Sequence, residues 1–334
     1  MTEQELLSKM VAPGQPRETK WRQGVIQILV TSSCDLGCYN CTQASNLSRK
    51  HWVMMPDQFE AAVKSLAGYF GVFGVFGGNP PVSKYFNEYC EILQALVPFE
   101  QRGLWSNNPL GKGKIMRRTF NPGVSNLNVH LSQAAYDEFK RDWPECMPCG
   151  LNKDSRHSPP WVAMKDVIDD EDKIRDMIST CDVNRFWSAM IGVFRGQLRA
   201  WFCEIAGAQA ILHQDELDYP DTGAKILDWG ATEILDWEGL RGQGILSTIP
   251  KKWWELPMNE YRWQVRKHCF DCGVPLRGYG ELAQGNGKEQ VSESHAHLFK
   301  PKRKGRQVEV VTELIQLEIG KIEKVNAYLQ NAKV

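Results

Sequence analysis

The chain has 334 residues, enough to bury a large core or to build one large domain with a smaller one. Its 40 lysines and arginines equal its 40 aspartates and glutamates, so no global field favours nucleic acid or a membrane surface. Residues 1–16 lack a long apolar core, and no apolar run approaches the ~18–20 residues of a membrane span, so we expect a cytoplasmic protein. Ten cysteines in such a chain indicate metal or redox use rather than a disulfide framework.

A polar leader, residues 1–22, precedes an apolar stretch at 25–30 that predicts a first strand. Directly after it come Cys34, Cys38 and Cys41 in a C-x3-C-x2-C run. Three thiolates this close cannot all form disulfides with one another, but they can converge on one metal centre. Iron–sulfur clusters are held by cysteine thiolates at such short spacings, and three ligands would leave one iron of a four-iron cluster open. Zinc is the alternative, although structural zinc sites usually pair two C-x2-C-like elements.

A helix is predicted next, over 56–69, and then a glycine-punctuated strand over 71–76 that ends in Gly77-Gly78-Asn79-Pro80. The cysteine run and this segment together resemble the radical SAM (S-adenosylmethionine) superfamily. That family carries Gly-Gly-Glu-Pro here, and its backbone holds the amino group of the methionine moiety. Asn79 stands in place of Glu, so an amide oxygen would accept from the ammonium without a charge. The other interpretation of residues 77–80 is an ordinary strand-to-helix turn.

A second departure from the family is Asn40, which stands where an aromatic residue usually precedes the third cysteine. Helices are predicted at 84–96, 133–141 and 169–179, and strands at 103–105, 126–131 and 161–164. Strands that alternate with helices indicate parallel pairing and right-handed crossovers. The resemblance implies an α/β fold, a partial (β/α)6 radical SAM barrel over residues 23–178.

Polar residues at strand ends are further candidates for binding S-adenosylmethionine, because barrel chemistry sits where strands end. They are Ser106, Asn107 and Asn108 after the third predicted strand and Ser132 after the fourth. Each could equally be a helix cap or a turn former. Cys146 and Cys149 form a C-x2-C pair that could supply a hydrogen-donor thiol, replace cluster ligands or remain a free dithiol.

The second cysteine constellation is Cys181, Cys203, Cys269 and Cys272. One cysteine precedes a predicted hairpin, one ends it and a distant C-x2-C pair follows. This order resembles the "twitch" domain of radical SAM enzymes, a shortened SPASM domain, and implies a small domain over 179–290 with an auxiliary 4Fe–4S cluster. Four cysteines would ligate that cluster fully, so it could pass electrons but not anchor a substrate. A four-cysteine zinc ribbon is the alternative.

The remaining residues, 291–334, contain a basic linker at 300–306 and an apolar pattern near helical period over 307–329. We expect a C-terminal amphipathic helix that packs on the barrel.

The resemblance implies a function for the whole chain. The expected enzyme reductively cleaves S-adenosylmethionine to a 5′-deoxyadenosyl radical, which abstracts a hydrogen from a small polar (sugar or nucleotide-linked) or peptide substrate. The outcome would be dehydrogenation, epimerisation or decarboxylation, an oxidoreductase or lyase-type reaction. Its electron donor would be of flavodoxin or ferredoxin type, and nucleic acid is not an expected partner. The competing hypothesis is a non-enzymatic zinc-binding interaction module.

Overall fold

The computed structural model describes most of the chain. The described residues are 1–17, 24–45, 47, 51–130, 132–146, 151–152, 160–226, 252–279, 288–299 and 307–312.

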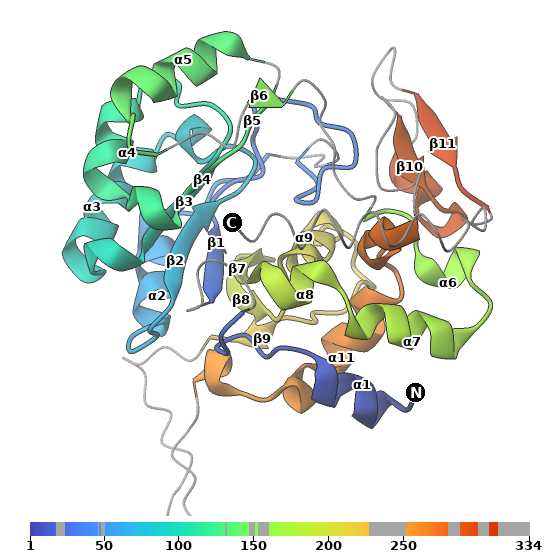
Figure 1. Ribbon diagram of the computed structural model, residues 1–334. Helices are drawn as coiled ribbons and strands as arrows, with labels where there is room; N and C mark the ends of the chain where they lie inside the picture. The colour runs from blue at the N-terminus through green and yellow to red at the C-terminus, as the bar shows by residue number, and fades with distance from the viewer. Residues whose placement is uncertain are drawn as a thin grey trace, which may run out of the picture.

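The centre of the fold is a seven-stranded mixed sheet with the strand order β4-β3-β2-β1-β7-β8-β9 (Figure 1). Its strands are β1 (Val25–Leu29), β2 (Val72–Phe76), β3 (Arg102–Ser106), β4 (Asn126–Leu127), β7 (Ser188–Phe194), β8 (Gln197–Trp201) and β9 (Ala224–Lys225). The strands from β4 to β7 in this order pair parallel, whereas β8 and β9 are antiparallel additions. Two small parallel pairs stand apart: β5 (Val129–His130) with β6 (Leu151–Asn152), and β10 (Glu289–Val291) with β11 (Val308–Val310).

Burial on both faces explains why β1 and β2 read as apolar runs. Every residue of both strands is buried, as expected for the middle of a parallel sheet covered by helices. Their register pairs Val25 with Val72 and Leu29 with Phe76, so the two strands end at the same level.

The helices between the strands cover the outer side of the sheet (Figure 1). They are α2 (Pro56–Ser65), α3 (Phe86–Leu96), α4 (Gly113–Thr119) and α5 (Gln133–Asp142). Later in the chain come α6 (Met164–Val167), α7 (Glu171–Ser179), α8 (Asp182–Phe186) and α9 (Glu204–Leu212). The helix α2 shows the pattern that the sequence predicts, because Phe59, Ala62 and Val63 on one face are buried and Pro56 occupies its first turn. This mixed α/β arrangement with a parallel sheet fits the expected partial barrel.

The shorter helical segments lie mainly in connections and in the C-terminal half. They are η1 (Pro80–Val82), η2 (Phe99–Gln101), η3 (Pro122–Val124), η4 (Trp253–Glu255), η5 (Met258–Tyr261), α11 (Arg262–Gln264), η6 (Val265–Cys269), η7 (Val274–Tyr279) and η9 (Glu293–Phe299). The leader contains α1 (Glu3–Lys9), whose Leu6 and Leu7 are buried, and it packs against α7 and η5.

Three elements differ from the sequence expectation. The predicted strand at 161–164 is a buried turn that leads into α6; Trp161 and Val162 are apolar because they are core residues there. The predicted strand at 126–131 is divided into β4 and β5, which pair with different partners. A C-terminal helix is expected from residue 307 onward, but residues 308–310 form the strand β11, which pairs with β10. Residues 313–334 lie outside the described part.

The hairpin between the cysteines Cys181 and Cys203 consists of β7 and β8. Its first strand pairs parallel with β1, so the central sheet runs continuously from the barrel strands into the hairpin. The boundary placed between residues 178 and 179 falls in the last turn of α7, and it assigns β7 to the second domain although β7 belongs to the same sheet as β1. The division into a 23–178 barrel and a 179–290 domain stays a prediction.

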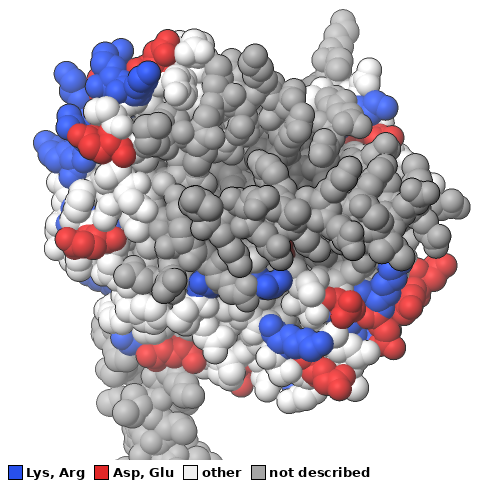
Figure 2. All heavy atoms as spheres, viewed as in Figure 1, with Lys and Arg blue, Asp and Glu red and all other residues white. Residues whose placement is uncertain are grey.

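The surface agrees with a balanced composition. On the face in Figure 2, basic and acidic side chains are interspersed over the described part of the chain. Within the described ranges, no helix combines the length and the apolar character that crossing a bilayer requires.

Candidate active site and second cysteine pocket

The carboxyl ends of three adjacent parallel strands bring the predicted cofactor residues together. The cysteine run follows β1, residues 77–80 follow β2, and residues 106–108 follow β3. Because these strands are neighbours and point the same way, their following loops meet at one edge of the sheet. Loops of this kind at strand ends are where α/β barrels place their chemistry.

Gly77 and Gly78 pack against the backbone that leads into the cysteine run. A Cβ added at Gly77 would lie 2.5 Å from the Thr31 carbonyl oxygen, and one at Gly78 only 2.1 Å from that of Ser33. The backbone N–H of Gly78 donates to the Thr31 carbonyl at 2.9 Å, and that of Asn79 to the Ser33 carbonyl at 2.8 Å. The close approach that requires glycine is thus an approach to the cysteine loop itself.

The side chain of Asn79 connects all three loops. It is fully buried; its Nδ2 donates to Asp35 Oδ1 at 2.9 Å and to the Asn108 carbonyl at 3.0 Å. Its Oδ1 accepts from the Ser106 hydroxyl at 2.8 Å. Asn108 Nδ2 also donates to Asp35 Oδ2 at 2.6 Å, so both oxygens of this carboxylate are held. The side chain of Pro80 is buried at the start of η1.

The sulfur of Cys34 accepts two hydrogen bonds. The backbone N–H of Leu36 and the side-chain Nδ2 of Asn107 each donate to it at 3.4 Å. Burial raises the pKa of Cys34 to about 11, although both hydrogen bonds favour the thiolate. Such donors stabilise a sulfur that carries negative charge, which is the state required for ligating iron.

The third cysteine lies beside a contact with the C-terminal strand β10. Asn40 has a φ of 52°, in the left-handed region that Asn tolerates better than most residues, which accounts for an Asn rather than an aromatic residue here. Its backbone N–H donates to Glu289 at 2.7 Å. Burial raises the pKa of Cys41, backbone hydrogen bonds from Ser45 and Gln43 lower it, and the Glu289 charge raises it further. Cys38 is half-buried in the same loop.

Two of the other candidates have structural roles in the described chain. Ser132 is the N-cap of α5, and its hydroxyl accepts from the Ala135 backbone at 3.2 Å. Cys146 is 1% exposed, and its sulfur lies 4.0 Å from the Pro122 carbonyl. It follows the C-terminal end of α5, and its role as a hydrogen donor stays a prediction. Cys149 lies outside the described residues.

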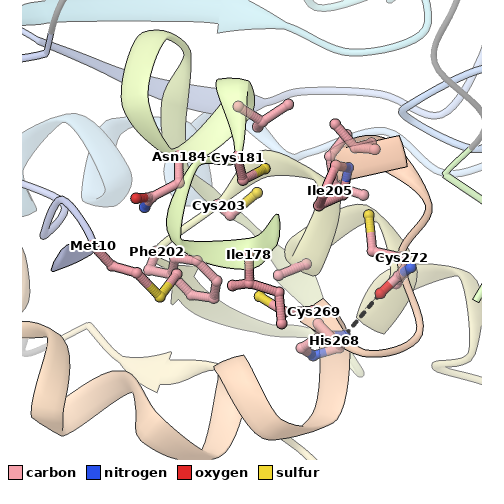
Figure 3. Close-up of a pocket in the computed structure, with 15 residues that line it drawn as sticks. Met10, Ile178, Cys181, Asn184, Phe202, Cys203, Ile205, His268, Cys269 and Cys272 are labelled. Atoms are coloured by element: carbon pink, nitrogen blue, oxygen red, sulfur yellow. Dashed lines mark hydrogen bonds between the residues drawn. The ribbon is translucent and has the colours of Figure 1, made fainter. Parts of the chain in front are cut away.

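The second cysteine constellation is brought together in one pocket. Cys181, Cys203, Cys269 and Cys272 all line it (Figure 3). The rest of the lining is largely apolar and includes Met10 of the leader, Ile178, Phe202, Ile205 and Val274. Residues 88 positions apart, from 181 to 269, therefore converge only through the fold.

Three of these cysteines stand at an end of a helical segment. Cys181 and Cys203 are the N-caps of α8 and α9, and Cys269 ends η6. Backbone hydrogen bonds from α8 and α9 lower the thiol pKa values of Cys181 and Cys203, but burial dominates and raises that of Cys203 to about 12. Burial also raises the pKa values of Cys269 and Cys272 well above their usual range. Four buried thiolates require positive charge at their centre, which iron would supply.

Polar side chains that line the pocket hold the C-x2-C segment. His268 is buried; its Nδ1 lies 3.1 Å from Gln209 Oε1 and its Nε2 lies 2.8 Å from Thr222 Oγ1. Burial lowers the pKa of His268 to about 3, so the ring is neutral. Gln209 Nε2 also donates to the Asp271 carbonyl at 3.2 Å, between Cys269 and Cys272. These contacts orient the segment toward α9.

The sulfur spacing does not match a single zinc ion. A Zn–S bond of about 2.3 Å places tetrahedral sulfur ligands roughly 3.8 Å apart. In the part of the chain that the structure describes, the trio whose ligand atoms all lie within 4.8 Å of one another is His213, Glu216 and His297, and it contains no cysteine. Neither cysteine set of the described residues has three sulfur atoms that all lie within 4.8 Å of one another.

Several residues at these sites carry no signal that sequence reasoning used. Asp35 and Glu289 contact the first site, and Gln209 and His268 support the second. Asp35 lies inside the cysteine run, so its position could have indicated it. Glu289 and Gln209 are distant in the chain, and only the fold identifies them.

Comparison with known proteins supports the resemblance to the radical SAM superfamily. No family model matches the chain. A GTP 3′,8-cyclase from Pseudomonas putida (strain GB-1), a radical SAM enzyme, is 26% identical over 118 residues, which are 35% of this chain and 35% of that protein. The match thus spans about a third of the length of this curated relative.

Among solved structures, BtrN in complex with AdoMet and 2-DOIA aligns with a TM-score of 0.36 and 12% identity, over 59% of this chain and 83% of that one. This TM-score is too low to carry an argument. The C-x3-C-x2-C run, the parallel sheet that presents it and the similarity to the cyclase together support the membership of this chain in the radical SAM superfamily.

Proposed function

We propose that the chain is a radical SAM enzyme with two four-iron clusters. Cys34, Cys38 and Cys41 would hold the first, and S-adenosylmethionine would bind at the adjoining strand ends. The observation that supports this most directly is the hydrogen-bonded junction of the three strand-end loops at Asn79, next to a Cys34 sulfur that accepts two N–H groups. When bound, the cluster supplies the electron that cleaves S-adenosylmethionine to a 5′-deoxyadenosyl radical.

The residues around Asn79 divide the task of holding the methionine moiety. The backbone N–H groups of Gly78 and Asn79 donate hydrogen bonds to the cysteine loop. The backbone carbonyl groups of residues 77–80 are therefore the acceptors for the ammonium group of the methionine moiety. Asp35 adds the charge that Asn79 lacks, because Asn79 and Asn108 orient both oxygens of its carboxylate. A carboxylate at position 79 would instead face that of Asp35 and repel it.

The second cluster would be bound by Cys181, Cys203, Cys269 and Cys272. Four ligands leave no iron open, so the role that fits is electron transfer rather than substrate anchoring. The substrate class is a small polar sugar, a nucleotide-linked compound or a peptide, and the reaction is a dehydrogenation, epimerisation or decarboxylation. A flavodoxin or ferredoxin would supply the electrons.

The test measures iron and 5′-deoxyadenosine in two sets of variants. Replacing Cys34, Cys38 and Cys41 by Ala should remove about four irons and abolish 5′-deoxyadenosine formation from S-adenosylmethionine. A Cys269→Ala/Cys272→Ala variant should lose about half its iron but still form 5′-deoxyadenosine. A Cys90→Ala variant is the control, because Cys90 is buried within α3. Cleavage by the triple variant would refute the first site, and full iron in the double variant would refute the second.

A further inference from the structure

A buried arginine of the leader lies beside the second cysteine pocket. Arg17 is 3% exposed, and its NH1 donates to the backbone carbonyl of Asn184 in α8. Asn184 also exchanges two hydrogen bonds with the backbone of Val11, at 2.9 and 3.0 Å. The leader is thereby fixed against the helix that begins at Cys181.

The guanidinium has more donors than the protein uses. Its Nε and NH2 find no hydrogen-bond partner among the residues that the structure describes. Burial lowers the pKa of Arg17 to about 10, which still leaves it charged at neutral pH. An unpaired charge in the interior is costly, so its presence indicates a negative group that completes the site.

The groups that interact electrostatically with the guanidinium of Arg17 include two cysteines of the pocket. These groups are Tyr69, Cys203, Glu204 and Cys181. The phenol of Tyr69 is neutral, because burial raises its pKa above the usual range. The carboxylate of Glu204 accepts from the Ser188 hydroxyl, and it makes no hydrogen bond to Nε or NH2 of Arg17. The remaining neighbours are two of the four proposed cluster ligands.

A cluster with four thiolate ligands is negatively charged, and reduction adds one more negative charge. A buried cation beside it favours the reduced form, and N–H donors to sulfur act in the same direction, because net charge, hydrogen bonding and exposure set cluster potentials. We propose that Arg17 is the charge partner of the second cluster and raises its reduction potential, which makes that cluster a better electron acceptor. This inference rests on the proposed second cluster.

The experiment isolates the second cluster in the full chain. Cys34, Cys38 and Cys41 are replaced by Ala, the protein is reconstituted anaerobically, and the reduced fraction is followed by electron paramagnetic resonance during titration with dithionite and redox mediators. In this background, Arg17→Gln should lower the reduced-to-oxidised ratio at fixed potential by about tenfold, which is ~59 mV for one electron. Arg17→Lys should retain most of the potential. Arg141→Gln is the matched control, because Arg141 is exposed and pairs with Asp142.

The outcomes separate this inference from the second cluster itself. About four irons with an unchanged potential in Arg17→Gln would overturn the role of Arg17 and leave the cluster in place. A background protein without iron would refute the cluster, and the inference with it. If Arg17→Gln does not retain iron, Arg17→Met and Arg17→Lys decide. Iron in the Lys variant but not in the Met variant supports the requirement for charge, whereas loss from both shows that only the packing of arginine matters.

Discussion

Asn40 and Glu289 are 249 positions apart in the chain, and the backbone N–H of Asn40 donates to Glu289 Oε2 at 2.7 Å. The side chain of Asn40 completes the contact, because its Oδ1 accepts from the backbone N–H of Gln290 at 3.0 Å. Glu289 is fully buried. The strand β10 is therefore attached to the loop that carries Cys38 and Cys41, and the C-terminal part of the chain helps to shape the first site.

Replacing Asn40 tests whether this attachment positions the third cysteine. Asn40→Ala removes the hydrogen bond to Gln290 and the polar side chain that lets Asn adopt the left-handed region, where other residues pay about 1–2 kcal/mol. We expect less iron at the first cluster and faster hydrogen exchange in residues 288–291. Asn40→Gly is the control, because it keeps the backbone conformation and loses only the side-chain bond. Equal iron in wild type and Asn40→Ala would show that β10 does not position Cys41.

Asp35 is expected to contribute more to S-adenosylmethionine affinity than Asn79. Asp35→Asn should weaken binding by about 1.5–3 kcal/mol, because a charged hydrogen bond is lost, and Asn79→Ala by about 0.5–1.5 kcal/mol. Both are measured by calorimetry with the reconstituted protein. Asp169→Asn, a change at an exposed position before α7, should leave the affinity unchanged. Wild-type affinity in Asp35→Asn would assign the methionine amine to other acceptors.

Gly78→Ala should damage the first site while the second remains. The added Cβ would lie 2.1 Å from the Ser33 carbonyl oxygen, so residues 31–34 must shift and Cys34 with them. We expect the variant to lose about four irons and to retain about four. Gly111→Ala is the comparison: its Cβ meets nothing within 4 Å, and its φ of +77° makes it a test of backbone strain alone. A Gly78→Ala protein with full iron would show that the loop tolerates displacement.

Gln209 should be required for the second cluster although it is not a ligand. Gln209→Ala leaves Nδ1 of His268 and the Asp271 carbonyl without a partner, at a cost of about 1–3 kcal/mol for each buried group. Thermal unfolding of the metal-free protein and iron content after reconstitution measure the effect. Gln133→Ala, at the exposed start of α5, is the control. If Gln209→Ala reconstitutes as well as wild type, the C-x2-C segment is held by other contacts.

Stability should fall as the pH decreases below about 6.5, because burial lowers the pKa of His295 and His130 and the unfolded chain then binds more protons. The stability that these two histidines contribute is fully present above their pKa in the unfolded chain. It is lost as the pH falls toward their lower pKa in the folded protein. Each proton that the unfolded chain binds in excess adds at most ~1.4 kcal/mol per pH unit to the slope of the unfolding free energy against pH. His295→Gln should flatten the curve of unfolding free energy between pH 7 and 5. An unchanged slope would contradict the burial argument for His295.

Short-range patterns in the sequence were sufficient for the α/β class and the order of the first strands and helices. The apolar runs of β1 and β2 and the amphipathic face of α2 each lie within about a dozen residues, where strand or helix period is visible directly. The C-x3-C-x2-C run also predicts its chemistry locally, because closely spaced thiolates have few other uses. The cysteine run after a buried strand was thus enough to indicate the superfamily.

Tertiary structure alone decided how distant groups combine. The sequence predicts Trp161 in a strand, because a short apolar segment buried in a turn cannot be distinguished by its residues from one buried in a sheet. Asn79 looked like a ligand for S-adenosylmethionine, yet its amide also joins Asp35, Asn108 and Ser106. Arg17 and Glu289 carry no local pattern at all. Such contacts join residues that are far apart in the chain and come together only when the sheet and its helices pack. Sequence periodicity shows which face of one element is buried, but not which neighbour covers that face.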